Sequence, residues 1–174
     1  LNNMNSTFSK TSAPENEIKK FLTDNDIEIK QSLRKPLNGV EIDLYSDKHR
    51  IGIEFNGNLF HTELYGKKDF NYHLNKTKIA ELNNIKLLHI HEDEWINKKE
   101  IIKHKLLYLF NKSNGIKLHA RKCLIKETTK NEKIEFLERY HIQGNDQSNI
   151  FYGAYFNNTL VAVMTFNNKR NLNK

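Results

Sequence analysis

The sequence predicts an α/β fold, and three observations lead to that expectation. Segments with the helical spacing of apolar residues occur in turn with short segments in which apolar and polar residues alternate. Up to residue 112 their order is helix, two strands, helix, strand, helix, which is typical of a sheet covered by helices. The chain has 174 residues, enough for one domain of ordinary size, or one domain and a fragment of another.

The first predicted helix begins at the segment SAPE. Ser12 is a typical N-cap residue, and Glu15 follows it by three positions, as in a capping box. Glu17 stands one turn before Phe21, so we expect its carboxylate at the edge of the buried face of this helix.

Two strands are predicted next, over residues 40–45 and 50–55, joined by the short turn SDKH. Apolar residues alternate with other residues in both. If the strands pair in the antiparallel sense, Asp43 and Glu54 come to lie near each other on one face of the sheet.

A lysine-rich helix is predicted over residues 71–84, followed by a strand over residues 85–95 and an amphipathic helix, KKEIIKHKLLYLF. The composition then changes at KSNGIKLHARK, and we place a domain boundary there. We expect a flexible N-terminus over residues 1–11, a first domain over residues 12–115 and a basic C-terminal α/β segment over residues 116–174.

Within the C-terminal segment we expect a short strand over residues 117–125 and a helix over residues 132–140. Two further strands form a hairpin that turns at Asn157 and Asn158.

Charge and cysteine content restrict the classes of partner and site. The formal net charge is +7 and the pI is about 9.3, which favours an anionic partner, nucleic acid above all. Residues 116–174 carry 10 basic and 5 acidic residues, against 18 and 16 in the rest of the chain. The single cysteine, Cys123, excludes an internal disulfide and a cysteine-based zinc site. With no apolar run of membrane-spanning length and no signal peptide, we expect a soluble, cytoplasmic protein without a membrane partner.

Asp43 and Glu54 are the first candidates for chemistry. Two carboxylates on neighbouring strands repel each other unless a cation lies between them, which favours a magnesium site. Such an ion would polarise a phosphate oxygen and activate water. Glu17 is either a third oxygen ligand or an ordinary surface glutamate.

The segment IEFNGNLFHTE continues from Glu54 through the Asn56-Gly57 turn to His61. His61 has three interpretations: a surface loop histidine, a zinc ligand, or a general base, and the spacing of the other histidines does not favour zinc. Leu59 and Phe60 are either core residues or a wedge between DNA bases. Lys76, on the lysine-rich helix, is either a solvated lysine or a group that stabilises charge on the phosphate.

Together, the helix with Glu17, EID, IEFNG, the basic helix and the following strand resemble the PD-(D/E)xK nucleases and their restriction-endonuclease-like α/β/α core. FNGNLFH resembles the glycine-aromatic-histidine segment of very short patch repair (Vsr) endonucleases. The run from SAPENEI to HIHEDEW is similar to the related phage-borne EDxHD-type homing endonucleases. The resemblance covers residues 12–112.

The resemblance implies that Asp43 is the central metal ligand, that the backbone carbonyl of Phe55 completes the metal shell, and that His61 is the base. It also implies that Glu17 supports the site. This chain departs from the E-x-K pattern, because Asn56 stands where a lysine is expected, and Lys76 or His73 is then the substitute for its charge.

The second region, from ARKCLIKE to VAVMTF, resembles the front half of a GNAT-type acyltransferase fold, and no glycine-rich pyrophosphate loop follows its hairpin. We interpret it as an incomplete segment that either contacts DNA or serves as a scaffold element. The residues expected to contact DNA are Leu59, Phe60, Lys67, Lys68, Lys78, Arg121 and Lys122.

The sequence therefore predicts a Mg²⁺-dependent endonuclease acting on double-stranded DNA in a bacterial or phage-infected cell, with Mn²⁺ as a substitute metal. A homodimer would supply the two active sites of a double-strand cut. The alternatives are an inactive DNA-binding module on a nuclease scaffold and an acyltransferase formed by the C-terminal segment.

Overall fold

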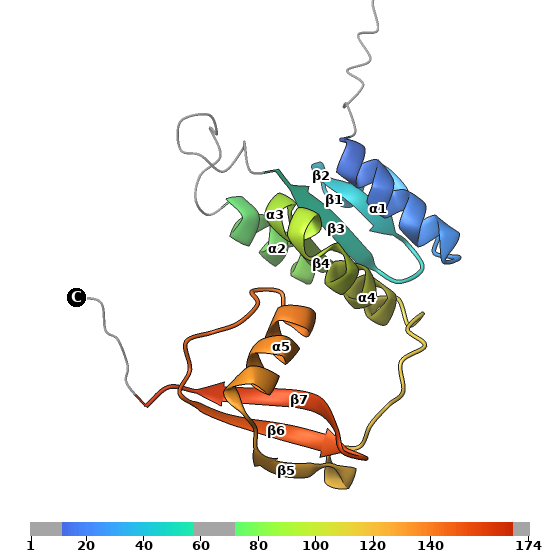
Figure 1. Cartoon of the computed structure of the whole chain (residues 1–174). Coiled ribbons are helices and arrows are strands. Elements are labelled where there is room, and N and C mark those ends of the chain that lie inside the picture. The colour runs from blue at the N-terminus through green and yellow to red at the C-terminus, as the bar shows by residue number, and fades with distance from the viewer. Residues whose placement is uncertain (1–11, 58–71, 169–174) are drawn as a thin grey trace, which may run out of the picture. The chain divides into compact units, whose positions relative to one another are not determined.

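The computed structural model describes residues 12–57 and 72–168 and divides the chain into two compact units (Figure 1). The first unit spans residues 1–113 and the second residues 114–174. In the described parts of the chain, no helix is long and apolar enough to cross a bilayer.

The first unit is built around a mixed four-stranded sheet with the order β1-β2-β3-β4. Strands β1, β2 and β3 are antiparallel neighbours, and β4 is parallel to β3. Its elements are α1 (Ala13–Asp24), β1 (Lys30–Leu37), β2 (Val40–Ser46), β3 (Ile51–Asn56), α2 (Tyr72–Leu82), β4 (Lys86–His91), α3 (Glu92–Asn97) and α4 (Lys99–Leu109).

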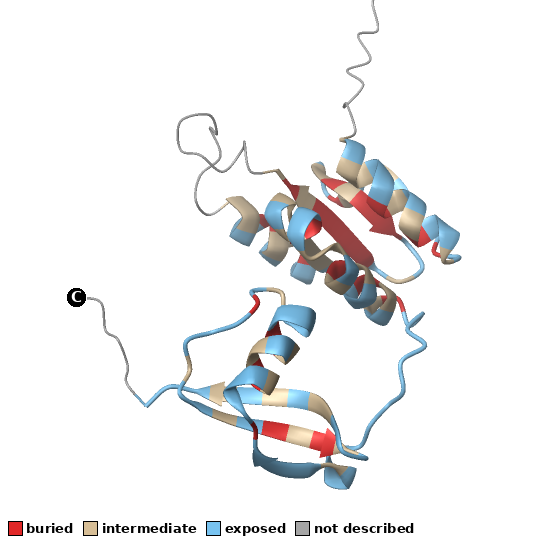
Figure 2. Cartoon of the chain, in the orientation of Figure 1, coloured by how far each residue is buried: buried red, intermediate tan, exposed pale blue. Residues whose placement is uncertain are grey.

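The helices form layers on the two faces of this sheet. Helices α1 and α4 contact each other on one face, and α2 packs on the other (Figure 1). Ala80 of α2 joins a buried cluster with Leu37, Ile42 and Tyr45, and Figure 2 shows the burial concentrated on the strands. These layers, with a second sheet in the C-terminal unit, confirm the predicted α/β fold class.

The first helix begins where the SAPE segment predicts. The Ser12 hydroxyl accepts a hydrogen bond from the Glu15 backbone N–H and donates one to the Glu15 carboxylate, at 3.4 and 2.7 Å. Both hydrogen bonds fix the first turn of α1, and this turn places the Glu15 side chain near Glu41 and Asp43 of β2.

Strand β1 is an element that the sequence did not predict. Its sequence, KQSLRKPL, is polar and contains Pro36, and both features argue against a strand in the middle of a sheet. Because β1 lies at the edge, one side of its backbone needs no ladder partner, and a proline is tolerated there.

The predicted strand over residues 85–95 is too long at its C-terminal end. Strand β4 ends at His91, and the acidic residues after it form the first turn of α3. The Glu94 carboxylate accepts a hydrogen bond from the His91 backbone N–H at 3.3 Å, so the HEDE segment begins a helix.

The second unit is a three-stranded antiparallel sheet with the order β5-β6-β7 and one longer helix. Its elements are the 3₁₀ turn η2 (Ala120–Lys122), β5 (Leu124–Glu127), α5 (Lys130–Tyr140), β6 (Ile150–Phe156) and β7 (Thr159–Phe166). The strand predicted over residues 117–125 was therefore placed too early, since η2 occupies part of that range. The hairpin turn is confirmed: Asn157 and Asn158 have φ of 48° and 63°, a conformation that asparagine tolerates well.

Helix α5 is held to the following loop by a buried lysine. The Lys133 side chain is 2% exposed, and its ammonium group donates to Asn145 Oδ1 at 2.8 Å, the Asp146 carbonyl at 2.6 Å and Asp146 Oδ1 at 2.7 Å. Burial alone would raise the pKa of Asp146, but hydrogen bonds from Lys133, Ser148 and Thr165 outweigh it and lower that pKa.

We expect Lys133→Met to loosen this loop, because three hydrogen bonds disappear together and the methionine keeps only the apolar part of the side chain. The expected loss is about 1–3 kcal/mol of local stability. Hydrogen exchange measured by mass spectrometry should become faster over residues 141–149, whereas Lys130→Met, at an exposed position of the same helix, should leave it unchanged. Unchanged exchange in Lys133→Met would show that the lysine does not anchor the loop.

Candidate functional site

A cavity of about 370 Å³ lies in the first unit, where α1, α2 and the strands β2 and β3 meet. Carboxylates dominate its wall, and a lysine, a histidine and an asparagine complete the polar groups. The lining residues are Glu15, Glu41, Asp43, Glu54, Phe55, Asn56, Tyr72, His73 and Lys76.

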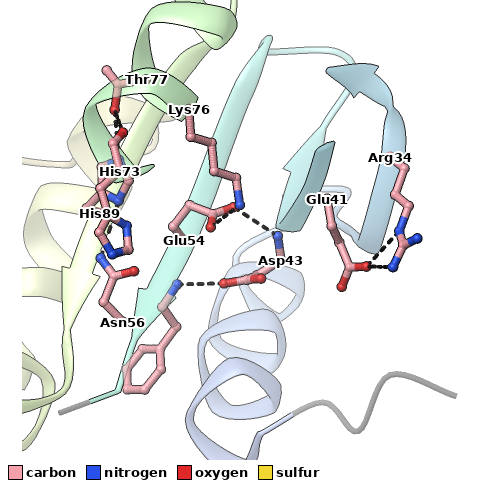
Figure 3. A network of polar contacts seen from close by, with 10 residues as sticks. Arg34, Glu41, Asp43, Glu54, Asn56, His73, Lys76, Thr77 and His89 are labelled. Carbon is pink, nitrogen blue, oxygen red and sulfur yellow. Dashed lines mark hydrogen bonds and ion pairs between the residues drawn. The ribbon is translucent and has the colours of Figure 1, made fainter. Parts of the chain in front are cut away.

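Asp43 and Glu54 come together just beyond the point where the backbone pairing of β2 and β3 ends. The backbone register runs from Ser46 opposite Ile51 to Leu44 opposite Ile53. Beyond it, Asp43 Oδ2 accepts a hydrogen bond from the Phe55 backbone N–H at 2.8 Å, and Glu54 Oε1 accepts one from the Asp43 backbone N–H at 3.3 Å (Figure 3). Each carboxylate thus binds the backbone of the other strand, which fixes both acids at the cavity.

Glu54 is a buried acid with a buried cationic partner. Its side chain is 6% exposed and forms an ion pair with Lys76, whose side chain is 5% exposed. Burial, followed by the negative charge of Asp43, raises the pKa of Glu54 to about 7, and Lys76 offsets only part of this increase. The carboxyl group therefore exchanges a proton near neutral pH.

The structure corrects the position of the helix glutamate. Glu17 points away from the cavity: its carboxylate accepts a hydrogen bond from Trp95 Nε1 at 3.1 Å and pairs with Lys99 Nζ at 2.8 Å. Glu15 lines the cavity instead. Burial raises the pKa of Glu15 and the charges of Asp43 and Glu41 add to the increase, while the Ser12 hydrogen bond opposes it.

Helical spacing explains this correction. The buried residues of α1 are Ile18 and Leu22. Glu15 precedes them by three and seven positions and therefore shares their face of the helix, whereas Glu17 does not. The sequence carries this signal in the spacing of Glu15 from Ile18 and Leu22, whereas the spacing of Glu17 from Phe21 points to a different side of the helix.

His89, a residue that the sequence patterns do not indicate, lies next to Asn56. His89 Nδ1 lies 3.3 Å from Asn56 Nδ2, and His89 Nε2 lies 2.9 Å from the hydroxyl of Thr77 (Figure 3). Burial, aided by the nearby His73, Lys76 and His91, lowers the pKa of His89 to about 4. His89 is therefore neutral at physiological pH. Nothing in the sequence pattern marks it, because its neighbour Asn56 is 33 positions away.

The remaining predicted residues fall into three groups. His73 lines the cavity and its ring stacks edge-on against His89, with the ring centroids 5.6 Å apart. The basic residues Lys78 on α2 and Arg121 and Lys122 in η2 are exposed. The residues Leu59, Phe60, His61, Lys67 and Lys68 lie outside the described part of the chain.

The donor groups of the cavity determine which metal ion it could hold. Within residues 12–57 and 72–168, no three side chains of His, Cys, Asp or Glu form a group that could hold a metal by themselves. Two carboxylates, Asp43 and Glu54, do share the cavity. Mg²⁺ typically takes one or two carboxylates and keeps several waters, so this donor set fits Mg²⁺ better than a metal bound wholly by side chains.

The chain is similar to a solved structure. A chain titled "Homing Endonuclease I-Bth0305I Catalytic Domain" is similar, with 21% sequence identity and a TM-score of 0.48 over 57% of this chain and 95% of that chain. No protein-family profile matches the chain, and no curated protein matches it.

Proposed function

We propose that the protein is a Mg²⁺-dependent endonuclease that hydrolyses phosphodiester bonds in double-stranded DNA. One observation carries the proposal: Glu15, Glu41, Asp43 and Glu54 line a single cavity in a chain whose formal net charge is +7. Acids gathered in a basic protein are typical of a site that receives a cation between them and an anionic substrate.

The balance of charge supports a bound cation. Glu54 already has Lys76 as a partner, and Glu41 accepts two hydrogen bonds from Arg34 at 2.8 and 2.9 Å. Burial is the main cause of the raised pKa of Glu15, and the negative charge of Asp43 adds to it, so these two carboxylates repel each other. A DNA phosphate entering this cavity would be repelled, and a divalent ion removes that repulsion.

Each residue then has a distinct task. Asp43, Glu54 and the backbone carbonyl of Phe55 would hold Mg²⁺, which supplies Lewis-acid activation of the phosphate and of water when it is bound. The contacts of Asp43 and Glu54 with the opposite strand orient both carboxylates in advance. Lys76, buried beside Glu54, adds a positive charge where the pentavalent phosphate would develop negative charge.

Basic residues at the surface fit a duplex DNA partner. Lys78, Arg121 and Lys122 are exposed and would neutralise backbone phosphates without reading sequence. Such contacts make binding weaker as the salt concentration rises. The plasmid assay that tests the activity also distinguishes a nicked product from a double-strand cut.

The proposal is tested by incubating supercoiled plasmid and a panel of linear duplexes with the protein in Mg²⁺, Mn²⁺ and EDTA. We expect cleavage in Mg²⁺ and Mn²⁺ and none in EDTA. Binding of duplex DNA by gel shift without cleavage in either metal would overturn the nuclease and leave the inactive DNA-binding module. Metal-independent cleavage that survives in EDTA would overturn the metal site.

Metal affinity should depend on pH through Glu54. Because the pKa of Glu54 is raised to about 7, the metal-free protein carries a proton there below that pH, and metal binding must displace it. Apparent affinity for Mn²⁺ should therefore fall as the pH is lowered from 8 to 6, by up to about tenfold per pH unit below the pKa. Calorimetric titration in buffers of different ionisation enthalpy counts the released proton. In Glu54→Gln the pH dependence should disappear, and an unchanged dependence would assign the proton to another group.

A further inference from the structure

Asn56 occupies the position where the E-x-K pattern has a lysine. Its hydrogen bonds determine which of its polar groups, the amide nitrogen or the amide oxygen, faces the cavity. Asn56 is 7% exposed as a whole residue and lines the cavity. An amide has a donor end and an acceptor end, so its role depends on which end faces the cavity. That orientation follows from a chain of contacts through His89 to Thr77.

The chain of contacts starts at Thr77. Its hydroxyl donates its one hydrogen to the His73 backbone carbonyl at 2.9 Å, an i to i−4 bond within α2. The Thr77 oxygen can therefore only accept from His89, whose Nε2 lies 2.9 Å away. Nε2 is thus the protonated nitrogen of the His89 ring.

The tautomer of His89 then fixes Asn56. The Asn56 amide nitrogen, which can only donate, lies 3.3 Å from His89 Nδ1, so Nδ1 carries a lone pair and accepts this hydrogen bond. Figure 3 shows the amide nitrogen of Asn56 turned to the ring and the amide oxygen on the other side of the amide group.

From this relay we infer that Asn56 presents its amide oxygen to the cavity as a hydrogen-bond acceptor for water, and that His89 and Thr77 are the residues that position it. The inference rests on the proposed function for its catalytic meaning: the water would be the one that attacks the phosphodiester. An amide oxygen orients water but is too weak a base to take its proton, so Asn56 is a water-positioning residue. The lysine of the E-x-K pattern is a cationic donor, and in this chain the amide oxygen of Asn56, a neutral acceptor, takes its place. The positive charge at the site comes from Lys76 on α2.

Orientation is tested without activity, by NMR of the wild-type protein with ¹⁵N-labelled histidine. Long-range ¹H–¹⁵N correlation spectra distinguish the two neutral tautomers. We expect His89 as the Nε2–H form at pH 7, and a mixture of both forms in Thr77→Val, which removes the acceptor. Thr159→Val, at an exposed strand position in the second unit, should leave the His89 signals unchanged. An Nδ1–H or doubly protonated His89 in the wild type would overturn the inference, whether or not the protein cleaves DNA.

The catalytic part is tested with single-turnover cleavage. Asn56→Leu and His89→Phe should each lower the rate of the chemical step about 10- to 100-fold, with DNA affinity and Mn²⁺ affinity unchanged. His89→Gln, which keeps an acceptor for Asn56 and a donor for Thr77, should recover most of the rate. Full activity in both Asn56→Leu and His89→Phe would overturn the positioning role. Absence of cleavage by the wild type would instead overturn the proposed function, with the NMR result still deciding the orientation of Asn56.

Discussion

Asp43→Asn is expected to lower the rate of plasmid cleavage at least about 1,000-fold, equivalent to roughly 4 kcal/mol of transition-state stabilisation. The substitution removes the charge of the proposed central metal ligand and changes little else. An asparagine oxygen can still accept the hydrogen bond from the Phe55 backbone N–H, now 2.8 Å from Asp43 Oδ2. The melting temperature should therefore stay close to that of the wild type, while metal affinity measured by calorimetry falls with the activity.

Asp47→Asn is the matched control for this variant. Asp47 follows the same strand and pairs at the surface with Lys30, and its side chain is 58% exposed. Removal of its charge should leave the cleavage rate within about twofold, as for most surface pairs. Cleavage by Asp43→Asn within about tenfold of the wild type would show that the cavity is not where DNA is cut.

Lys76→Met is expected to have the largest effect on stability, about 3 kcal/mol at pH 8. Removing one partner of a buried ion pair leaves the other charge uncompensated, and such changes typically destabilise by about 3–5 kcal/mol. The effect lies at the lower end because Glu54, whose pKa is already raised to about 7, can take up a proton. Urea unfolding followed by the fluorescence of Trp95, a buried residue of the same unit, reports the change.

Two comparisons make this prediction specific. Lys20→Met breaks an exposed pair with Asp24, whose side chains are 74% and 57% exposed, and should change stability by less than about 0.5 kcal/mol. The destabilisation of Lys76→Met should be smaller at pH 6 than at pH 8, because a protonated Glu54 needs no cation. Glu54→Gln combined with Lys76→Met should be more stable than the sum of the single variants predicts. Equal losses at both pH values, with additive single variants, would show that the pair is not coupled.

The fold class was accessible from the sequence because its helices and central strands carry clear local signals. The Ser12 cap, the apolar alternation in β2 and β3 and the paired asparagines of the β6–β7 turn each act over a few residues. The sequence of β1 carries no such local signal. Its backbone hydrogen bonds with β2 hold this segment in the extended conformation that its own residues do not favour. The observed end of β4 lies before the predicted one, because the three acidic residues after His91 begin α3 and do not continue the strand to Trp95.

Less of the candidate site could be predicted. The proximity of Asp43 and Glu54 followed from antiparallel pairing, a regular relation between neighbouring strands. Glu15 matches a capping box in the sequence pattern, and its spacing from Ile18 also places it on the buried face of α1. His89 is brought to Asn56 by the parallel pairing of β3 with β4, with α2 between them in sequence. Such a contact between distant residues depends on the crossover connection from β3 to β4. No periodic pattern in the sequence indicates it.

The division of the chain into two units has a consequence for how this protein can change over evolutionary time. Every residue that lines the cavity lies between Glu15 and Lys76, within the first unit. Recombination at the junction between residues 113 and 114 would pass on the whole cavity to a new C-terminal partner. The second unit has its own anchor in Lys133, and the lining residues of the cavity all come from the first unit. The residues of the cavity and the residues of the second unit can therefore be inherited separately.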